Sequence, residues 1–171
     1  DNKVVNLQNI NRLVRRAVSV GPGAQMVCLP ECCVFMGHNG DQTVEAAEPI
    51  FREKNYPEAR CGLDYLSAPP VEYDGRSDIN CVAALCEIAH VNHVWLSVGG
   101  FPERSDDSSM FNTHFMISPE GRISSSLYRK MHLFDSPLVG LRESRTTGEY
   151  MIMCGFFFFS MCRWYCFLFF M

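Results

Sequence analysis

Two stretches of the chain share the same order of an amphipathic helix, a turn and a short apolar run. In the first, apolar residues recur at spacings of three and four from Leu7 to Val18, the period of one helix face. Asn6 is the predicted N-cap, and the glycines on either side of Pro22 are predicted to end the helix. The apolar run 26–29 then predicts a buried strand. A helix and a strand in this order indicate one half of an α/β layer.

The second unit repeats this order later in the chain. Apolar residues at helical spacing occupy positions 79–89, with Ser77 or Asp78 as the predicted N-cap. The strand predicted at 94–98 follows, and the glycine pair 99–100 is predicted to close it. The two units together predict a layered α/β domain.

A β-hairpin is predicted after the second unit. Apolar and polar residues alternate over 111–117, a turn of hairpin length follows at 119–122, and a second strand is predicted over 123–130. Residues 51–78 have no sustained period and are predicted to be a long loop or an insertion. We therefore expect one domain over residues 1–149.

The C-terminal segment 150–171 differs sharply from this body, because 19 of its 22 residues are apolar. As a helix rising about 1.5 Å per residue, it would reach across a bilayer core of about 30 Å. Arg163 near its middle counts against a membrane anchor. We favour aberrant or alternative sequence, such as intron read-through, a frameshift or a splice variant, over a genuine anchor or a pair of core strands. Residues 51–78 are open to the same interpretation.

Charge and cysteine content exclude some classes of function. The chain has 171 residues, a formal net charge of -4 and no basic cluster, so we expect no nucleic-acid partner. Its nine cysteines are odd in number, and the sequence has neither an N-glycosylation acceptor nor an N-terminal apolar signal. This pattern predicts reduced thiols and a cytoplasmic location. His90 and His93 have a metal-like spacing without a second ligand pair, so we predict no metal and no cofactor.

Three charged residues occupy positions where α/β proteins place chemistry. Glu31 follows the strand 26–29 and Pro30, at the predicted carboxyl edge of a sheet. Lys130 ends the second hairpin strand, and Glu143 lies in the loop beyond. Taken alone, each is expected to be a solvated surface charge.

The motifs around these residues carry more information than their positions. In order, they are Leu29-Pro30-Glu31, the segment Trp95 to Glu103, the segment Tyr128-Arg129-Lys130-Met131-His132-Leu133-Phe134-Asp135, and Arg142-Glu143-Ser144. This order resembles the nitrilase superfamily of carbon-nitrogen hydrolases, and within it the Nit branch. The resemblance covers roughly residues 5–50 and 79–147, and the tyrosine-arginine-lysine-x-histidine-leucine segment is its most specific part.

This resemblance implies an α-β-β-α sandwich, of which the chain would form only the N-terminal portion. It also implies hydrolysis of a non-peptide amide by a cysteine nucleophile, with Glu31 as the general base. Lys130 would stabilise the oxyanion of the tetrahedral intermediate, and Glu143 would match the second, orienting glutamate. The implied substrate is a small amide such as a 2-oxo-dicarboxylic acid monoamide or deaminated glutathione. A homo-oligomer is implied for the full-length protein.

The nucleophile of this family is not found in the chain. The family's cysteine-tyrosine-aspartate-x-arginine-phenylalanine motif is absent, and Cys154 is the only candidate by position. Cys28, Cys32 and Cys33 flank Glu31 and are predicted to be spectator thiols. We therefore predict an incomplete amidase that is inactive as given. The alternative is a non-catalytic nitrilase-like binding protein, tethered to a membrane if the tail is genuine, and a mitochondrial location is a second option besides the cytoplasm.

Overall fold

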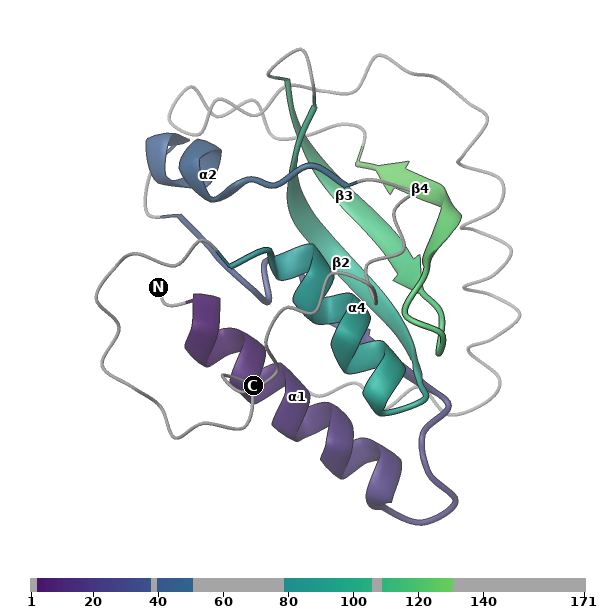
Figure 1. Cartoon of the computed structure of the whole chain (residues 1–171). Coiled ribbons are helices and arrows are strands. Elements are labelled where there is room, and N and C mark those ends of the chain that lie inside the picture. The colour runs from purple at the N-terminus through teal and green to yellow at the C-terminus, as the bar shows by residue number, and fades with distance from the viewer. Residues whose placement is uncertain (1–2, 38–39, 51–78, 106–108, 131–171) are drawn as a thin grey trace.

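A four-stranded sheet with helices packed against it makes up the described part of the chain (Figure 1). The computed structural model describes residues 3–37, 40–50, 79–105 and 109–130. The predicted α/β architecture is confirmed. The elements are, in chain order, α1 (Lys3–Ser19), β1 (Met26–Leu29), α2 (Gly40–Ala46), α4 (Cys81–Val91), β2 (Trp95–Arg104), β3 (Met110–Ile117) and β4 (Ile123–Arg129).

The strand order in the sheet follows the order along the chain, β1-β2-β3-β4. β1 and β2 are parallel, whereas β3 and β4 add in antiparallel orientation. The predicted hairpin is therefore confirmed, and its turn is closed by the N–H of Ser118, which donates to the carbonyl of Arg122 over 2.8 Å. Because β1 and β2 are parallel, their carboxyl ends meet at one edge of the sheet.

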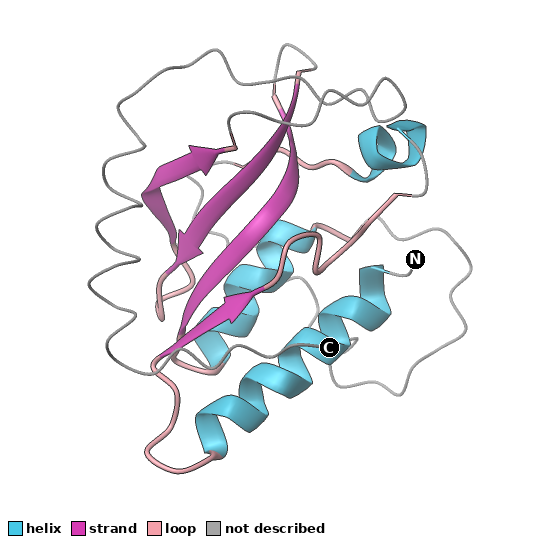
Figure 2. Ribbon diagram, turned by 180° about the vertical axis from the view of Figure 1, so that it is seen from behind, coloured by secondary structure: helices cyan, strands magenta, loops and turns pink. Residues whose placement is uncertain are grey.

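Helices α1 and α4 cover one face of the sheet, as the two opposite views show (Figures 1 and 2). The amphipathic stripe of α1 is buried there, as its period predicted. One polar contact joins the helices, because Asn92 donates from Nδ2 to Oδ1 of Asn11 over 3.3 Å. The largest fully buried side chains of this core include Leu7, Val14, Leu85, Ile88, Leu96, Val98, Phe115 and Ile117.

The opposite face of the sheet, which Figure 2 shows from behind, carries a polar contact between β2 and β3. Leu96 and Val98 face the helical layer, so Ser97 between them faces the other way. Its Oγ lies 2.8 Å from Nε2 of His114 on the neighbouring strand. Burial lowers the pKa of His114, which favours the neutral imidazole at physiological pH.

The helix N-termini differ from their predicted positions. α1 begins at Lys3, so Asn6 lies inside the helix, and its Nδ2 donates to the carbonyl of Val34 over 2.9 Å. The cap of α4 is Asn80, whose Oδ1 accepts from the N–H of Ala83 over 2.9 Å. Residues 77–78, where the cap was predicted, lie outside the described residues. Asn6 thus bonds to a distant segment, whereas α4 has a local cap that lies closer to the helix than predicted.

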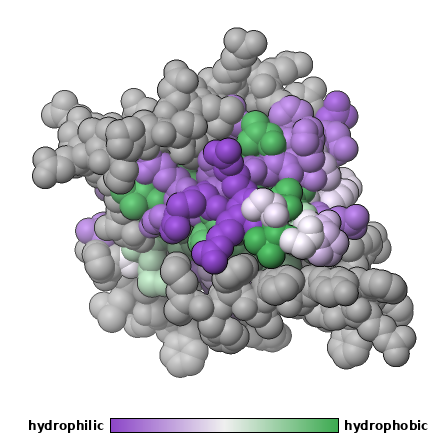
Figure 3. Space-filling view, turned by 90° about the horizontal axis from the view of Figure 1, so that it is seen from below, coloured by the Kyte–Doolittle hydropathy of each residue, from purple (hydrophilic) through white to green (hydrophobic). Residues whose placement is uncertain are grey.

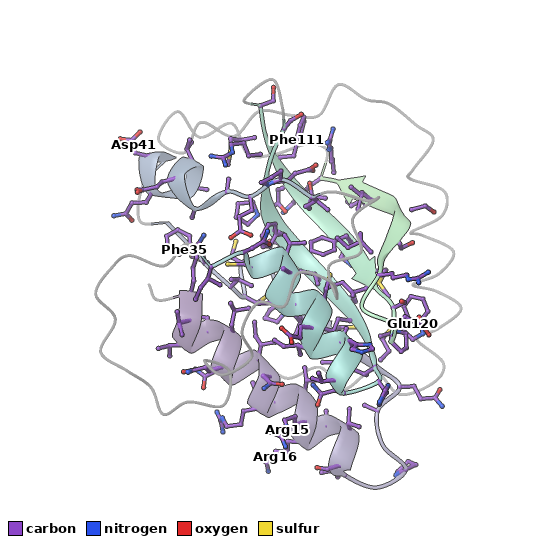
Figure 4. The ribbon with its side chains drawn as sticks, viewed as in Figure 1. Arg15, Arg16, Phe35, Asp41, Phe111 and Glu120 are labelled. Carbon is purple, nitrogen blue, oxygen red and sulfur yellow. The ribbon has the colours of Figure 1, made fainter. Side chains whose placement is uncertain are left out.

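The end of α1 follows the prediction. Gly23 has a φ of 78°, and a Cβ there would lie 2.8 Å from the carbonyl oxygen of Val18. A residue with a side chain would therefore be strained at this position. Arg15 and Arg16 lie on the outer side of α1, away from the sheet (Figure 4). The described surface seen from below is largely hydrophilic and has only small hydrophobic patches (Figure 3).

Two predicted segments lie outside the described residues, namely the insertion or loop at 51–78 and the apolar tail at 150–171. Within the described ranges, no helix is both long enough and apolar enough to cross a membrane. α2 was not predicted from the sequence. It is a short helix whose last residue, Ala46, is buried.

Candidate functional site

Glu31 lies at the carboxyl edge of the sheet, directly beyond β1 and Pro30. Its side chain is 58% exposed. The chain is held here by a backbone hydrogen bond from the N–H of Cys32 to the carbonyl of Gly100, over 3.1 Å. This bond ties the end of β1 to the middle of β2, so Glu31 is presented beside its neighbouring strand.

The glycine pair in β2 makes room for Glu31. The pairing of β2 with β3 shifts in register between Val98 and Phe101, which marks a β-bulge at the glycines. A Cβ on Gly100, whose φ is +24°, would lie 2.9 Å from Cγ of Glu31 and 2.8 Å from Oδ1 of Asn112. The prediction that the glycines close the strand is wrong, because β2 continues through them to Arg104. Their role is to let Glu31 and Asn112 approach the strand.

Lys130 contacts Glu31 from the end of β4, the opposite edge strand of the sheet. It directly follows β4, and its N–H donates to the carbonyl of Asn112 over 2.8 Å. Its Nζ lies 3.1 Å from Oε1 of Glu31, although the two residues are 99 positions apart. The structure therefore brings together two of the three predicted site residues, in an ion pair that remains open to solvent.

The thiols next to Glu31 are protonated at neutral pH. Burial, followed by the charge of Glu31, raises the pKa of Cys32, and the charge of Lys130 opposes this effect. Burial also raises the pKa of Cys33 to about 12. Because a thiolate is the reactive form, both groups are poor nucleophiles in this arrangement.

A second ion pair lies beside the first, and its carboxylate is buried. Glu103 is 3% exposed, and its carboxylate accepts from Nε of Arg129 over 3.0 Å and from Nη2 over 2.8 Å. Thr113 adds a third donor through Oγ1, at 2.5 Å from Oε2. The guanidinium also stacks 3.9 Å from the ring centroid of Phe111. Sequence reasoning missed this network, although the position of Arg129 directly before Lys130 was a usable signal.

A third ion pair joins α1 to the segment that follows α2. Nζ of Lys3 lies 3.2 Å from Oε1 of Glu48, and both side chains are about 15% exposed. Oε2 of Glu48 accepts from the N–H groups of Cys81 and Val82 at the start of α4. This carboxylate therefore offsets the positive end of the helix dipole. We interpret it as a structural contact, since it is built into the helix terminus.

The remaining candidates are not part of this site. Glu143 and Cys154 lie outside the described residues. His90 and His93 lie at the end of α4 with ring centroids 6.1 Å apart. Within residues 3–37, 40–50, 79–105 and 109–130, no group of three or more potential ligands could hold a metal ion. The described site thus consists of a carboxylate, an ammonium and a neighbouring amide from Asn112.

Comparison with known sequences identifies a family. A family profile described as carbon-nitrogen hydrolase matches residues 2–150. The nitrilase and fragile histidine triad fusion protein of Drosophila melanogaster is 35% identical over 146 residues, which are 84% of this chain and 25% of that protein. The deaminated glutathione amidase of Dictyostelium discoideum is 29% identical over 90% of this chain and 47% of its own length. The chain thus spans a quarter to about half of these relatives.

Solved structures share the fold. The Caenorhabditis elegans NitFhit protein superposes with a TM-score of 0.51 at 25% identity, over 82% of this chain and 27% of that one. Saccharomyces cerevisiae Nit3, a member of branch 10 of the nitrilase superfamily, gives a TM-score of 0.54 at 20% identity, over 85% and 45%. The second likeness concerns the fold alone.

Proposed function

Because the chain belongs to the carbon-nitrogen hydrolase family, we propose that it contributes two groups of an amidase active site, Glu31 as the general base and Lys130 as a fixed cation. The observation that carries this proposal is the 3.1 Å contact between Nζ of Lys130 and Oε1 of Glu31 at the carboxyl edge of the sheet. Both groups are partly open to solvent, so a substrate has access to them. A site of this kind hydrolyses a carbon-nitrogen bond in a small molecule.

Glu31 would act on protons in both halves of the reaction. It accepts the proton of a cysteine thiol, and the resulting thiolate attacks the carbonyl carbon of the amide. The tetrahedral intermediate then breaks its carbon-nitrogen bond, and the leaving amine takes the proton from Glu31. Water next attacks the thioester carbon and gives a proton to Glu31. The second tetrahedral intermediate then breaks its carbon-sulfur bond, Glu31 returns the proton to the leaving thiolate, and the carboxylic acid is released.

Lys130 would stabilise charge that develops during these steps. Both tetrahedral intermediates carry a negative charge on the former carbonyl oxygen. An ammonium held in position stabilises this oxyanion without the reorganisation that water would require.

The nucleophile does not belong to the described site. Cys32 is the nearest described thiol in sequence to Glu31, but burial and the glutamate keep it protonated. The family's cysteine motif is absent from the printed sequence, so the 171-residue chain is proposed to be inactive by itself. Glu143 is proposed to orient the site in the complete enzyme.

The proposed substrates are small amides of 2-oxo diacids. Several similar proteins are named deaminated glutathione amidase. Hydrolysis of deaminated glutathione, or of the monoamide of the 2-oxo diacid that it contains, releases that diacid in both cases, and the two reactions differ only in the amine. Measuring the diacid therefore tests both substrates with one assay.

The proposal is tested with the 171-residue chain and with a chimera. In the chimera, residues 1–149 replace the matching part of the Dictyostelium discoideum amidase, which then supplies the nucleophile. We expect no turnover by the 171-residue chain and measurable turnover by the chimera. In the chimera, Glu31→Gln and Lys130→Met should each lower kcat at least about 100-fold, as is usual for a general base or an oxyanion donor.

Glu120→Gln is the matched control, because Glu120 is exposed on the hairpin turn (Figure 4). It should leave kcat within about twofold of the parent chimera, as a surface substitution does. An active chimera that keeps its rate with Glu31→Gln would overturn the assignment of the base. Turnover by the 171-residue chain that is lost in Cys154→Ala would overturn the proposed lack of a nucleophile and would identify Cys154 as that nucleophile.

A further inference from the structure

We propose that Glu103 and Arg129 are positioning residues that hold Lys130 opposite Glu31. The inference rests on the proposed function of that pair and explains how its geometry is maintained. Lys130 follows Arg129 directly, so the fixed guanidinium of Arg129 sets the point from which the lysine side chain departs. Two ion pairs lie next to each other. Arg129 holds the buried carboxylate of Glu103 through two hydrogen bonds, whereas Lys130 contacts the exposed carboxylate of Glu31 through one.

The buried pair has the geometry of a rigid anchor. The two hydrogen bonds from Arg129 to Glu103 involve different nitrogens and different carboxylate oxygens, which is the bidentate arrangement. Such a fork fixes the plane of the guanidinium as well as its distance. Stacking on Phe111 restrains the remaining face. Because the Glu103 carboxylate is buried, it depends on these donors for its charge to be tolerated.

The anchor spans the three strands that lead to Lys130. Glu103 lies on β2, Thr113 on β3 and Arg129 on β4, and Thr113 is the register partner of Arg129. Directly after this pair, the N–H of Lys130 donates to the carbonyl of Asn112. The backbone at Lys130 is therefore held by its own hydrogen bond and by the side chain of the preceding residue.

The exposed pair cannot supply this order itself. Nζ of Lys130 and Oε1 of Glu31 are in contact, but their side chains are 43% and 58% exposed. Water competes for both groups, and a lysine side chain has many rotamers to choose from. Restraint of the Lys130 backbone reduces the number of positions that the ammonium can reach.

The pair of Lys3 and Glu48 provides an internal control. It is also largely buried, and it stabilises the start of α4 rather than the end of β4. A loss of global stability would loosen this pair and the pair of Lys130 with Glu31 together. A positioning role predicts that only the second responds to changes at Arg129.

The test is carbodiimide cross-linking of the full 171-residue chain. The reagent activates a carboxylate, the contacting amine forms an amide bond with it, and the urea of the reagent leaves. Mass spectrometry then compares the Glu31–Lys130 and Lys3–Glu48 cross-links in the same sample. Assignment is simple because the parent chain has only three lysines, at positions 3, 54 and 130. In Arg129→Lys, fragment ions separate a cross-link at position 129 from one at Lys130.

Arg129→Lys keeps the positive charge but removes the fork and the stacking. We expect it to lower the yield of the Glu31–Lys130 cross-link at least about threefold, a change within the range of couplings between residues of one network. The Lys3–Glu48 yield should stay within about 1.5-fold. Thr113→Val removes one neutral donor and should lower the yield of the Glu31–Lys130 cross-link by a smaller factor. This variant tests the positioning role if Arg129→Lys does not fold.

Two results would overturn the proposal. One is an unchanged Glu31–Lys130 yield in the folded variant, and the other is a parallel fall of both cross-links, which indicates a merely structural role. Glu48→Gln is the reverse control and should leave the Glu31–Lys130 yield unchanged. The readout does not use turnover, so failure of the positioning role is distinguishable from failure of the proposed hydrolysis.

Discussion

Glu31 and Glu103 lie at neighbouring parts of the sheet and pair with consecutive residues, yet their surroundings differ. Glu103 is buried and accepts three side-chain hydrogen bonds, whereas Glu31 is 58% exposed and has one ion-pair contact with Lys130. A buried carboxylate with both oxygens hydrogen-bonded has little capacity left for a ligand. The comparison separates a carboxylate that holds the strands together from one that is accessible to a ligand.

The largest expected effect is the loss of the buried pair. Arg129→Met leaves the Glu103 carboxylate with the hydroxyl of Thr113 as its side-chain donor in a poorly solvated place. Breaking a buried pair in this way costs about 3 to 5 kcal/mol, and the partial exposure of Arg129 favours the lower end. Urea unfolding followed by circular dichroism measures the change. A loss below about 1 kcal/mol would remove the distinction between the two carboxylates.

The next effect concerns the glycine beside Glu31. Gly100→Ala introduces a Cβ close to Glu31 and Asn112 at a φ of +24°, so we expect a loss of about 2 to 3 kcal/mol from strain and contact. Gly21→Ala is the matched control, because Gly21 has a φ of +61° and nothing within 4 Å of the added atom. It should cost only about 1 kcal/mol, from the backbone alone.

Urea unfolding of both variants gives this difference directly. Equal losses would mean that crowding at Glu31 contributes nothing and that the bulge serves backbone conformation only. A larger loss in Gly100→Ala, together with a reduced Glu31–Lys130 cross-link, would support the view that the glycines keep the exposed carboxylate in place.

How far the sequence predicts these features depends on how local their causes are. The stripe of α1 and the hairpin follow from periods of three to four and of two, and both are confirmed. Glu31 and Lys130 were predicted to be at strand ends, but strand periodicity alone contains no information about their contact. That expectation came from the order of motifs, because a contact between residues 99 positions apart is a property of the whole sheet.

The errors arose where distant contacts override local signals. Asn6 has the composition of an N-cap but bonds to Val34, a residue of a different segment. The glycine pair in β2 has the composition of a strand end but forms a bulge that accommodates Glu31. Because the strand was predicted to stop there, Glu103 was not predicted to be buried and its pairing with Arg129 was missed.

The stability of the protein should depend on pH through Cys33, which is partly buried close to the exposed Glu31 in the segment after β1. Burial raises the pKa of Cys33 to about 12, so the folded protein retains a proton that the unfolded chain loses above pH 9. The folded state therefore binds more protons between pH 9 and pH 12, and its stability falls as the pH rises through this window. The contribution of this thiol is about 1 kcal/mol between pH 9 and pH 10.

Urea unfolding at pH 8, 9 and 10 measures this slope, with Cys33→Ala as the comparison. The variant lacks the thiol, so its stability should fall less steeply with pH than that of the parent chain. If the free energy of unfolding fell equally with pH in both proteins, Cys33 would ionise as readily in the folded state as in the unfolded chain. Its thiol would then be accessible to solvent.

The smallest expected effect is the loss of the exposed pair, and it bears most directly on function. Lys130→Met should change the free energy of unfolding by less than about 1 kcal/mol, because the ion pair with Glu31 is screened by water. A double-mutant cycle with Glu31→Gln isolates the coupling between the two side chains, which should lie at about 0.2 to 1 kcal/mol. A coupling above about 2 kcal/mol would class this pair with the buried one. A small coupling is what the proposed chemistry requires, because a base and a cation that bind each other weakly can both turn to a substrate.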